Sequence, residues 1–255
     1  MLKMDEDALY LIACCKAKEP LGLDPPWPNT RMRREWDKFS PLDEERNSLV
    51  QFLSTLPRDQ AARVYVRRKP AQETDHAWKI NLSLEVAPTM PAIKRYIGTL
   101  YQQLDCDLKE QLLAGSMRNL LIVSALLGVL RPADRIPNYE LMMTDHIMDD
   151  EQVHVWWRRA FARHNLPQLL REYMPSLRRI FCFMSETTGY VSAIASLVEH
   201  FDLYVVKVTD GGFDRSPRAW GMGVRSCLEG RTQTPERVSE IVHAYGCTLV
   251  RLAGR

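Results

Sequence analysis

The apolar residues of this chain gather in short runs of strand length, which alternate with segments of helical periodicity. Residues 8–15, 120–124, 180–184 and 203–208 are apolar almost throughout, and residues 247–250 form a shorter fifth run. Runs this short, bounded by turn residues or helix starts, are typical of strands buried on both faces of a sheet. We expect the first four runs to belong to one sheet with one core.

A different pattern predicts one more strand, which would be only half-buried. Between residues 78 and 86 the apolar positions recur at every second residue, with polar or charged residues between most of them. Because successive side chains of a strand point to opposite faces, this period of two indicates a strand with one buried face. The apolar positions are Trp78, Ile80, Leu82, Leu84 and Val86.

Helix signals separate these runs. Residues 41–56 follow Ser40 as an expected N-cap, and Pro235 follows Thr234 in the same way, with acidic residues in both first turns. Residues 108–117 and 191–200 also have helical patterns. The acidic residues 149–151 would start a helix that ends in basic residues up to His164, and Pro167 would mark its stop. Strands alternating with helices predict an α/β fold, with a mostly parallel or mixed sheet flanked by helices and the whole of residues 1–255 in a single domain.

Composition narrows the classes of protein that remain. With 34 basic and 32 acidic residues the net charge is only +2, so any attraction to nucleic acid must come from local clusters. The six cysteines include no CxxC pair, which favours reduced thiols in the cytoplasm. The longest nearly uncharged apolar run spans about 12 residues, short of the roughly 20 needed to cross a bilayer, and acidic residues at the start argue against a secretory signal. We expect no membrane segment, no cofactor and no metal site, since His146, His154 and His164 lack ligand spacing.

The end of the first apolar run is the first candidate site. In open α/β sheets, ligands bind beyond the carboxyl ends of strands, and Cys14, Cys15 and Lys16 occupy that position. Because neighbouring residues of a strand face opposite sides, only one of the two cysteines is expected to line the cleft. Lys16 and Lys18 would hold an anion or lower the pKa of a thiol. The alternative is a buried core cysteine beside solvated lysines. A proline-rich stretch, residues 20–28, and a loop carrying Arg31, Arg33 and Arg34 follow.

The stretch from Ser124 to Tyr139 is the second candidate. It leaves an apolar run and enters a segment rich in turns, at Gly128, Pro132 and Pro137. Arg131 either braces this loop through an ion pair with Asp134 or presents its guanidinium to a phosphate or carboxylate. If both candidate segments follow parallel strands, Lys16 lies within reach of residues 128–139.

The sequence SALLGVLRPADRIPNYELM in this stretch resembles the central motif of the YaaA peroxide-stress family. The residues that fall in register are Ser124, Gly128, Leu130, Arg131, Pro132, Asp134 and Tyr139. Weaker similarities to the family lie at residues 12–16, at residues 96–101 beginning with Tyr96, at Ser185 and Tyr190, and at residues 218–221. The resemblance implies a YaaA-like α/β fold with a positively charged cleft, binding of double-stranded DNA, and a role in limiting oxidative damage to DNA.

The chain departs from that family pattern at two places. The family's Ser-Pro-Ala before the lysine is Ala13-Cys14-Cys15 here, and paired lysines of the family are replaced by Ser216-Pro217, which leaves Arg215, Arg218 and Arg225. The first change adds nucleophilic or redox-capable groups, and the second removes phosphate contacts.

Two further segments have both a nucleic-acid and a structural interpretation. Residues 220–223, Trp-Gly-Met-Gly, have the texture of a helix-hairpin-helix DNA contact, but glycines beside a tryptophan also serve close packing. Residues 153–179 are the most basic stretch, with Trp156, Trp157 and Phe161 interleaved among arginines. They form either a solvated helix face with buried aromatic residues or a nucleic-acid surface.

Three functional hypotheses follow. The first is a DNA-binding protein of the peroxide-stress response; its contacts would come from Lys18, Tyr96, Arg131, Asp134, Tyr139, Ser185, Tyr190, Arg218 and Arg225. The second is an enzyme acting on a small anionic or nucleoside-like substrate, with Cys14 or Cys15 as nucleophile, Lys16 holding the anion and Arg131 with Tyr139 orienting the substrate. The third, a redox sensor, would require a strained disulfide between adjacent cysteines. A long basic groove would favour DNA, and a closed pocket of a few hundred Å³ would favour a small molecule.

Overall fold

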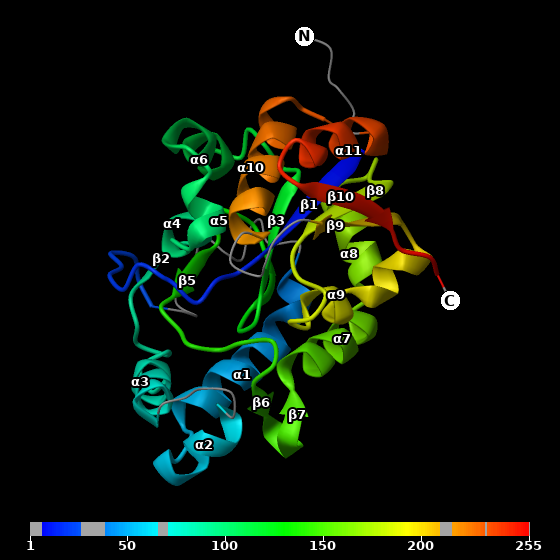
Figure 1. Cartoon of the computed structure of the whole chain (residues 1–255). Helices are drawn as coiled ribbons and strands as arrows, with labels where there is room; N and C mark the ends of the chain where they lie inside the picture. Colours follow the sequence, from blue (N-terminus) through cyan, green and yellow to red (C-terminus); the bar gives the residue numbers. More distant parts are fainter. Residues whose placement is uncertain (1–6, 27–38, 66–70, 210–215, 233, 255) are drawn as a thin grey trace.

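A mixed sheet of six strands runs through the centre of the computed structural model, which describes residues 7–26, 39–65, 71–209, 216–232 and 234–254 (Figure 1). The strand order is β10-β9-β8-β1-β3-β4. β1 pairs in parallel with β3 and β8, and β8 pairs in parallel with β9, whereas the edge strands β4 and β10 are antiparallel. The bounds are β1 Ala8–Ala13, β3 Leu120–Ser124, β4 Gly128–Leu130, β8 Arg179–Phe183, β9 Asp202–Val208 and β10 Cys247–Arg251. The predicted α/β fold with a mixed sheet is confirmed, and the four apolar runs expected in one sheet are β1, β3, β8 and β9.

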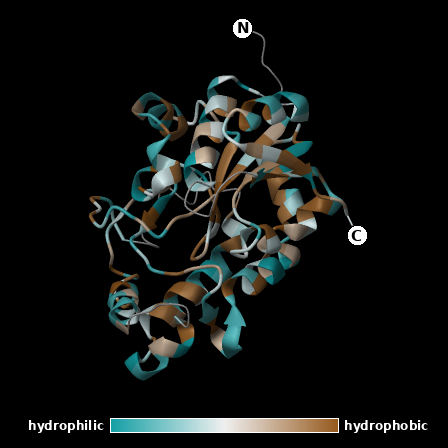
Figure 2. Cartoon of the chain, in the orientation of Figure 1, coloured by the Kyte–Doolittle hydropathy of each residue, from teal (hydrophilic) through white to brown (hydrophobic). Residues whose placement is uncertain are grey.

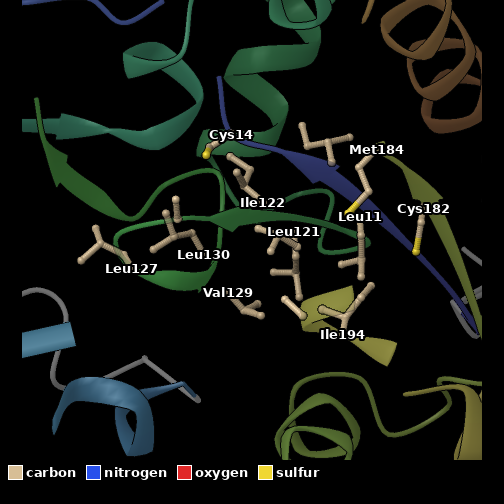
Figure 3. Packing of buried hydrophobic residues seen from close by; sticks show 14 of the residues in the cluster. Leu11, Cys14, Leu121, Ile122, Leu127, Val129, Leu130, Cys182, Met184 and Ile194 are labelled. Carbon is tan, nitrogen blue, oxygen red and sulfur yellow. The ribbon is translucent and has the colours of Figure 1, made fainter. Parts of the chain in front are cut away.

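These strands are apolar because both faces of the sheet are covered. Every residue of β3 is buried, and Leu9, Tyr10 and Ile12 of β1 are completely so. Figure 2 shows the hydrophobic strands enclosed by helices with hydrophilic outer faces. In Figure 3, Leu11, Leu121 and Cys182 project from neighbouring strands into one packed core. Burial of this apolar surface is the main stabilising contribution to the fold.

The helices form two layers around the sheet. α10 and α11 lie on one side, where α10 packs against α5, and α7 lies on the other side, packed against α9 (Figure 1). α1, α2 and α3 extend toward the bottom of the view, where the small hairpin of β6 (His146–Ile147) and β7 (Glu151–Gln152) also lies. A separate antiparallel pair, β2 (Thr89–Pro91) with β5 (Arg135–Pro137), packs against α4. The helix bounds are α1 Asp43–Ser54, α2 Ala61–Val64, α3 Ala71–Asn81, α4 Ala92–Arg95, α5 Thr99–Gln102, α6 Cys106–Leu113, α7 Val153–Arg163, α8 Leu166–Tyr173, α9 Tyr190–Ala193, α10 Ser216–Glu229 and α11 Pro235–His243.

The strand predicted at residues 78–86 is wrong. The segment is the end of α3, Ala71–Asn81, followed by turns. Its buried positions are Ala77, Asn81 and Leu84, a spacing of four and three, while Leu82 and Val86 are exposed. Asn81 is buried because its amide group bonds Tyr65 and both backbone groups of Glu140 at 2.6–2.9 Å. Because Asn81 is polar although it is buried, the apolar positions of this segment did not follow the period of a helix.

Several predicted helix boundaries also need correction. Ser40 makes no side-chain cap; a 3-10 turn, Ser40–Leu42, leads into α1. The acidic residues 149–151 lie before α7, with Asp149 in a left-handed conformation, and not in its first turn. Pro167 lies in the first turn of α8, and the Asn165 side chain caps that helix. Pro167 therefore belongs to the start of α8 as well as following the end of α7. Thr234 caps α11 as expected.

The stretch predicted as a turn-rich loop from Gly128 contains a strand. The chain reverses over residues 125–127, and β4 pairs antiparallel with β3, so Val129 lies opposite Val123. The carboxyl end of β4 consequently points away from the carboxyl ends of the parallel strands. The argument that placed Arg131 at the carboxyl edge of a parallel sheet is therefore wrong.

Among the described residues, no helix combines the length and the apolar character that crossing a membrane requires. The predictions that concern residues 1–6, Arg31, Arg33, Arg34 and Arg215 lie outside the described residues.

Candidate functional site

A pocket of about 410 Å³ lies beyond the carboxyl ends of β1, β8 and β9. Along the chain, strands are added on one side of β1 as β3 and β4, and on the other side as β8, β9 and β10. The boundary between β1 and β8 is therefore the point where the strand order reverses, which is the usual ligand position in open α/β sheets. We call this cavity the β1–β8–β9 pocket; its wall includes Cys14, Ser185, Glu186, Tyr190, Lys207 and Trp220.

The two adjacent cysteines have different surroundings. Cys14, 8% exposed, lines the β1–β8–β9 pocket, and its Sγ lies 3.0 Å from the Tyr190 hydroxyl (Figure 3 shows Cys14 at the end of β1). The Sγ of Cys15 accepts a hydrogen bond from the Gly98 amide at 3.3 Å and lies 3.0 Å from the Ala17 carbonyl oxygen. Burial raises the pKa of Cys15 to about 11, so this thiol is protonated at neutral pH. Of the two, Cys14 is the one that lines the pocket.

Three buried hydroxyl groups, those of Tyr96, Ser124 and Tyr139, form a hydrogen-bonded cluster. The Tyr139 hydroxyl lies 2.8 Å from that of Tyr96 and 2.9 Å from Ser124 Oγ. Burial raises the pKa of Tyr96, Tyr139 and Tyr190 well above the ordinary value for a phenol, and the nearby Cys14 raises it further. All three phenols therefore remain protonated and able to donate hydrogen bonds at neutral pH.

The two lysines after β1 have separate roles. Lys16 is exposed and forms an ion pair with Glu73 at 2.9 Å. Lys18 lies over the ring of Tyr139, with its Nζ 4.3 Å from the ring centroid, a cation–π distance. It is thus Lys18, and not the predicted Lys16, that the structure brings against a residue of the 128–139 segment.

Arg131 braces the segment in which it lies. Its Nε and Nη2 donate to Asp134 Oδ1 at 2.9 and 2.6 Å, and its backbone amide donates to Oδ2 at 2.8 Å. Asp134 is buried, so this arrangement satisfies a carboxylate that would otherwise be costly to bury. Neither residue lines the β1–β8–β9 pocket.

The rest of the pocket wall combines an aromatic face with hydroxyl and charged groups. The Trp220 indole is fixed by donating to the Val206 carbonyl at 2.8 Å. Lys207 pairs with Glu186 at 2.8 Å, and Ser185 Oγ lies 2.9 Å from Thr187 Oγ1. Sequence reasoning missed Trp220, Glu186 and Lys207 as pocket residues. The same rule that singled out Cys14 would have found Glu186 and Lys207, because they lie at the carboxyl ends of β8 and β9.

Two of the arginines proposed to contact DNA, Arg218 and Arg225, lie on α10. Arg218 is exposed. Arg225 forms ion pairs with Asp105 at 2.6 Å and Glu229 at 2.7 Å, and the bond to Glu229 raises its pKa. Two carboxylates therefore already balance the charge of Arg225.

Both segments with alternative interpretations contribute side chains or close contacts to the packing of the fold. Gly221 and Gly223 lie inside α10, where a methyl group at Gly221 would collide with the Leu100 carbonyl and one at Gly223 would lie 3.1 Å from the Phe183 ring. This is close packing within one helix, not a hairpin between two. In α7, Trp157 and Phe161 are completely buried, while the arginines of that helix are on its outer face.

Within the described part of the chain, no three His, Cys, Asp or Glu side chains come together as metal ligands would.

Comparison with known proteins identifies a family. Residues 9–180 match the family described as "Peroxide stress protein YaaA". A UPF0246 protein of Corynebacterium glutamicum is 38% identical over 105 residues, which is 40% of each chain. UPF0246 proteins of Salinispora tropica and Finegoldia magna are 30% and 27% identical over 125 residues, which is 48% of this chain and 48% and 49% of theirs. These alignments therefore span less than half of each relative.

Proposed function

This chain belongs to the YaaA peroxide stress protein family, and from that premise we propose that it binds a small nucleoside-like molecule in the β1–β8–β9 pocket and acts on it through Cys14. The observation that supports this proposal is the position of the Cys14 sulfur in the wall of the pocket at the reversal point of the sheet. The volume of about 410 Å³ falls within the 300–1,000 Å³ typical of small-molecule sites.

The chemistry of the wall favours a flat ring that carries polar substituents. The Trp220 indole offers an aromatic surface for stacking. Ser185 and Thr187 supply hydroxyl groups, and the paired Glu186 and Lys207 supply an acceptor and a donor at the rim. A nucleoside combines these features, because its planar base is joined to a sugar that bears hydroxyl groups.

Cys14 is proposed as the nucleophile because a thiolate is the reactive form of cysteine. The protonated Tyr190 hydroxyl lies 3.0 Å from its sulfur and stabilises the thiolate by donating a hydrogen bond. Cys15 is unsuited to this role, since its pKa is about 11.

Double-stranded DNA is the partner that the family resemblance implied, and it has less support here. Arg225 is held in ion pairs with Asp105 and Glu229, and Arg218 is the exposed arginine of the pair. Double-stranded DNA is therefore the alternative partner.

Binding of adenosine, guanosine and their monophosphates is measured by calorimetry on the full chain, and turnover is followed by mass spectrometry of the ligand. We expect Trp220→Ala to weaken nucleoside binding about tenfold or more through lost stacking and apolar contact. Trp78→Ala is the matched control: its indole also donates to a backbone carbonyl at 2.8 Å, but it lies outside the pocket wall. Cys14→Ala should preserve binding and abolish turnover, whereas Cys15→Ala should preserve both.

If none of these ligands binds at millimolar concentration while duplex DNA binds at about 50 mM salt, the low end of the range where phosphate contacts are strong, the DNA alternative replaces this proposal.

A further inference from the structure

β10 (Cys247–Arg251) lies at one edge of the six-stranded sheet, and its only partner among the described strands is β9 (Figure 1). Two backbone hydrogen bonds fix which of its residues face β9. The Thr209 amide donates to the Gly246 carbonyl at 3.0 Å, and the Leu252 amide donates to the Leu203 carbonyl at 2.9 Å. In an antiparallel pair the bonded residues alternate with unbonded ones. The even-numbered residues from 246 to 252 therefore direct their backbone groups toward β9.

The backbone groups of the residues between them point away from the sheet. These residues are Cys247, Leu249 and Arg251, and no described strand pairs with this side of β10. The strand contains no proline, and its pairing with β9 runs without a bulge from residue 247 to residue 251. Its one charged residue, Arg251, is paired with Asp202 of β9. β10 thus lacks the usual features that block an edge, and such an edge is a template for another strand.

The opposite edge of the sheet, β4, is covered by α1. Arg46 of α1 is completely buried, and its Nε and Nη2 donate to the carbonyl groups of Leu127 and Val129, both at 2.8 Å. A strand from another molecule could pair here only by displacing this buried guanidinium, which would leave its charge without these acceptors. Edge-to-edge pairing between copies of the chain is therefore open to β10 and closed to β4. Such pairing stops at two copies and does not continue into a fibre.

The sequence of β10 fits a second copy of itself in the antiparallel direction. If the pairing is centred on Leu249, this residue lies opposite Leu249 of the second copy, and each outward N–H meets a C=O. Cys247 then lies opposite Arg251, and Thr248 lies opposite Val250 on the other face of the sheet. No like charges are directly opposed, and the β-branched side chains form cross-strand pairs, which stabilise a sheet. Both copies use the same strip of surface, as a two-fold dimer requires.

We infer that two copies of this chain pair antiparallel along β10, centred on Leu249, and so join their sheets into one. Leu249 and Val250, which are only partly buried in the single chain, become further covered by this pairing. One short strand from each copy buries less than the roughly 1,200 Å² of a stable interface, so the dimer is weak and reversible. We expect it to form between about 10 and 500 µM. The inference does not depend on the function proposed for the β1–β8–β9 pocket.

Sedimentation velocity of the full chain over this concentration range is the first test. Leu249→Lys should raise the dissociation constant of the dimer about tenfold or more, because two lysines would face each other at the centre of the pairing. Leu23→Lys is the matched control, since it makes the same exchange at a leucine that is 100% exposed. It should leave the dissociation constant unchanged. Circular dichroism establishes that both variants fold.

A second test reads the register by cross-linking a mixture of Thr248→Cys and Val250→Cys chains under mild oxidation. Opposed residues of this kind have Cα atoms about 4.5 Å apart, which a disulfide can bridge. The mixture should give a disulfide between positions 248 and 250, identified by tandem mass spectrometry. Either variant alone should not cross-link at its new cysteine, because identical positions are diagonal neighbours about 7–8 Å apart.

A chain that stays monomeric up to about 500 µM overturns the inference, and the open edge is then left for a strand of a different protein. A dimer that Leu249→Lys does not weaken also overturns it, because another surface must then hold the two copies together. Should Leu249→Lys not fold, the cross-link decides: a disulfide between positions 248 and 250 supports the pairing, and its absence rejects it.

Discussion

Gly128 illustrates how a single residue determines the shape of the family motif. Its φ of 68° lies in the left-handed region, and a Cβ built at this position would lie 2.7 Å from the Trp157 ring. Trp157 also donates its indole hydrogen to the Ala125 carbonyl at 2.8 Å. The turn between β3 and β4 is therefore folded directly against α7, and only glycine satisfies both the backbone conformation and the close approach.

Gly128→Ala should lower the free energy of unfolding by about 2–4 kcal/mol, since it combines left-handed strain with overpacking against the Trp157 ring. Gly115→Ala is the control: Gly115 has a φ of 70°, but nothing lies within 4 Å of a Cβ at that position. Gly115→Ala should lower the free energy of unfolding by only about 1–2 kcal/mol, because it adds left-handed backbone strain without overpacking. Urea unfolding of both variants measures the difference, and equal losses would show that the Trp157 ring moves aside without cost.

Among the elements, α10 (Ser216–Glu229) links the pocket to the core. Its first residues and Trp220 line the β1–β8–β9 pocket, and its glycines allow close approach to α5 and β8. The sequence pattern did not identify this helix, because glycine at two interior positions lowers helix propensity. Packing against neighbouring elements outweighs that loss.

Gly221→Ala tests this balance within α10. Alanine would raise helix propensity by about 1 kcal/mol, but its Cβ would collide with the Leu100 carbonyl oxygen, which is backbone and cannot rotate away. We expect a net loss of about 1–3 kcal/mol of unfolding free energy. Gly223→Ala, whose Cβ would lie 3.1 Å from the Phe183 ring, should lower the free energy of unfolding by less. A Gly221→Ala protein more stable than the parent would contradict close packing of α10 against α5.

On the scale of the whole molecule, the charge distribution sets how strongly DNA is attracted. The net charge of +2 is small, and much of the basic charge on the described helices is locally paired. Arg159 pairs with Glu151, Arg163 with Glu45 and Arg225 with two carboxylates. Attraction of phosphate backbones by these helices is therefore weaker than their arginine content alone would suggest.

The salt dependence of duplex binding checks this interpretation. Each phosphate contact contributes a slope of about −0.9 in log K against log salt. Because Arg225 is already paired, we expect Arg218→Gln combined with Arg225→Gln to change the slope by one unit or less. Arg237→Gln, on α11 and paired with Glu240 at 2.6 Å, is the control. A change near two units would show that both arginines contact DNA phosphates.

Much of the fold was predictable because burial on both faces of a sheet demands an uninterrupted apolar run. β1, β3, β8 and β9 follow from that rule, and the carboxyl end of β1 led to Cys14. The family motif also indicated Ser124, Arg131, Asp134 and Tyr139. Where polar or small residues occupy buried positions, as Asn81 does in α3 and Gly221 in α10, local pattern failed to identify the element.

Residue order along the chain thus determined which segments become strands and which side chains lie at their ends. Only the tertiary structure decided that Cys14 faces the pocket while Cys15 faces Gly98, and that Lys18 rather than Lys16 meets Tyr139. It also joined the hydroxyl groups of Tyr96, Ser124 and Tyr139 in one hydrogen-bonded cluster and placed the Tyr190 hydroxyl against the Cys14 sulfur. The physical reason is that strand propensity depends on neighbours in sequence, whereas hydrogen bonds and burial depend on groups that only the packing of β1 beside β3 and β8 makes neighbours in space.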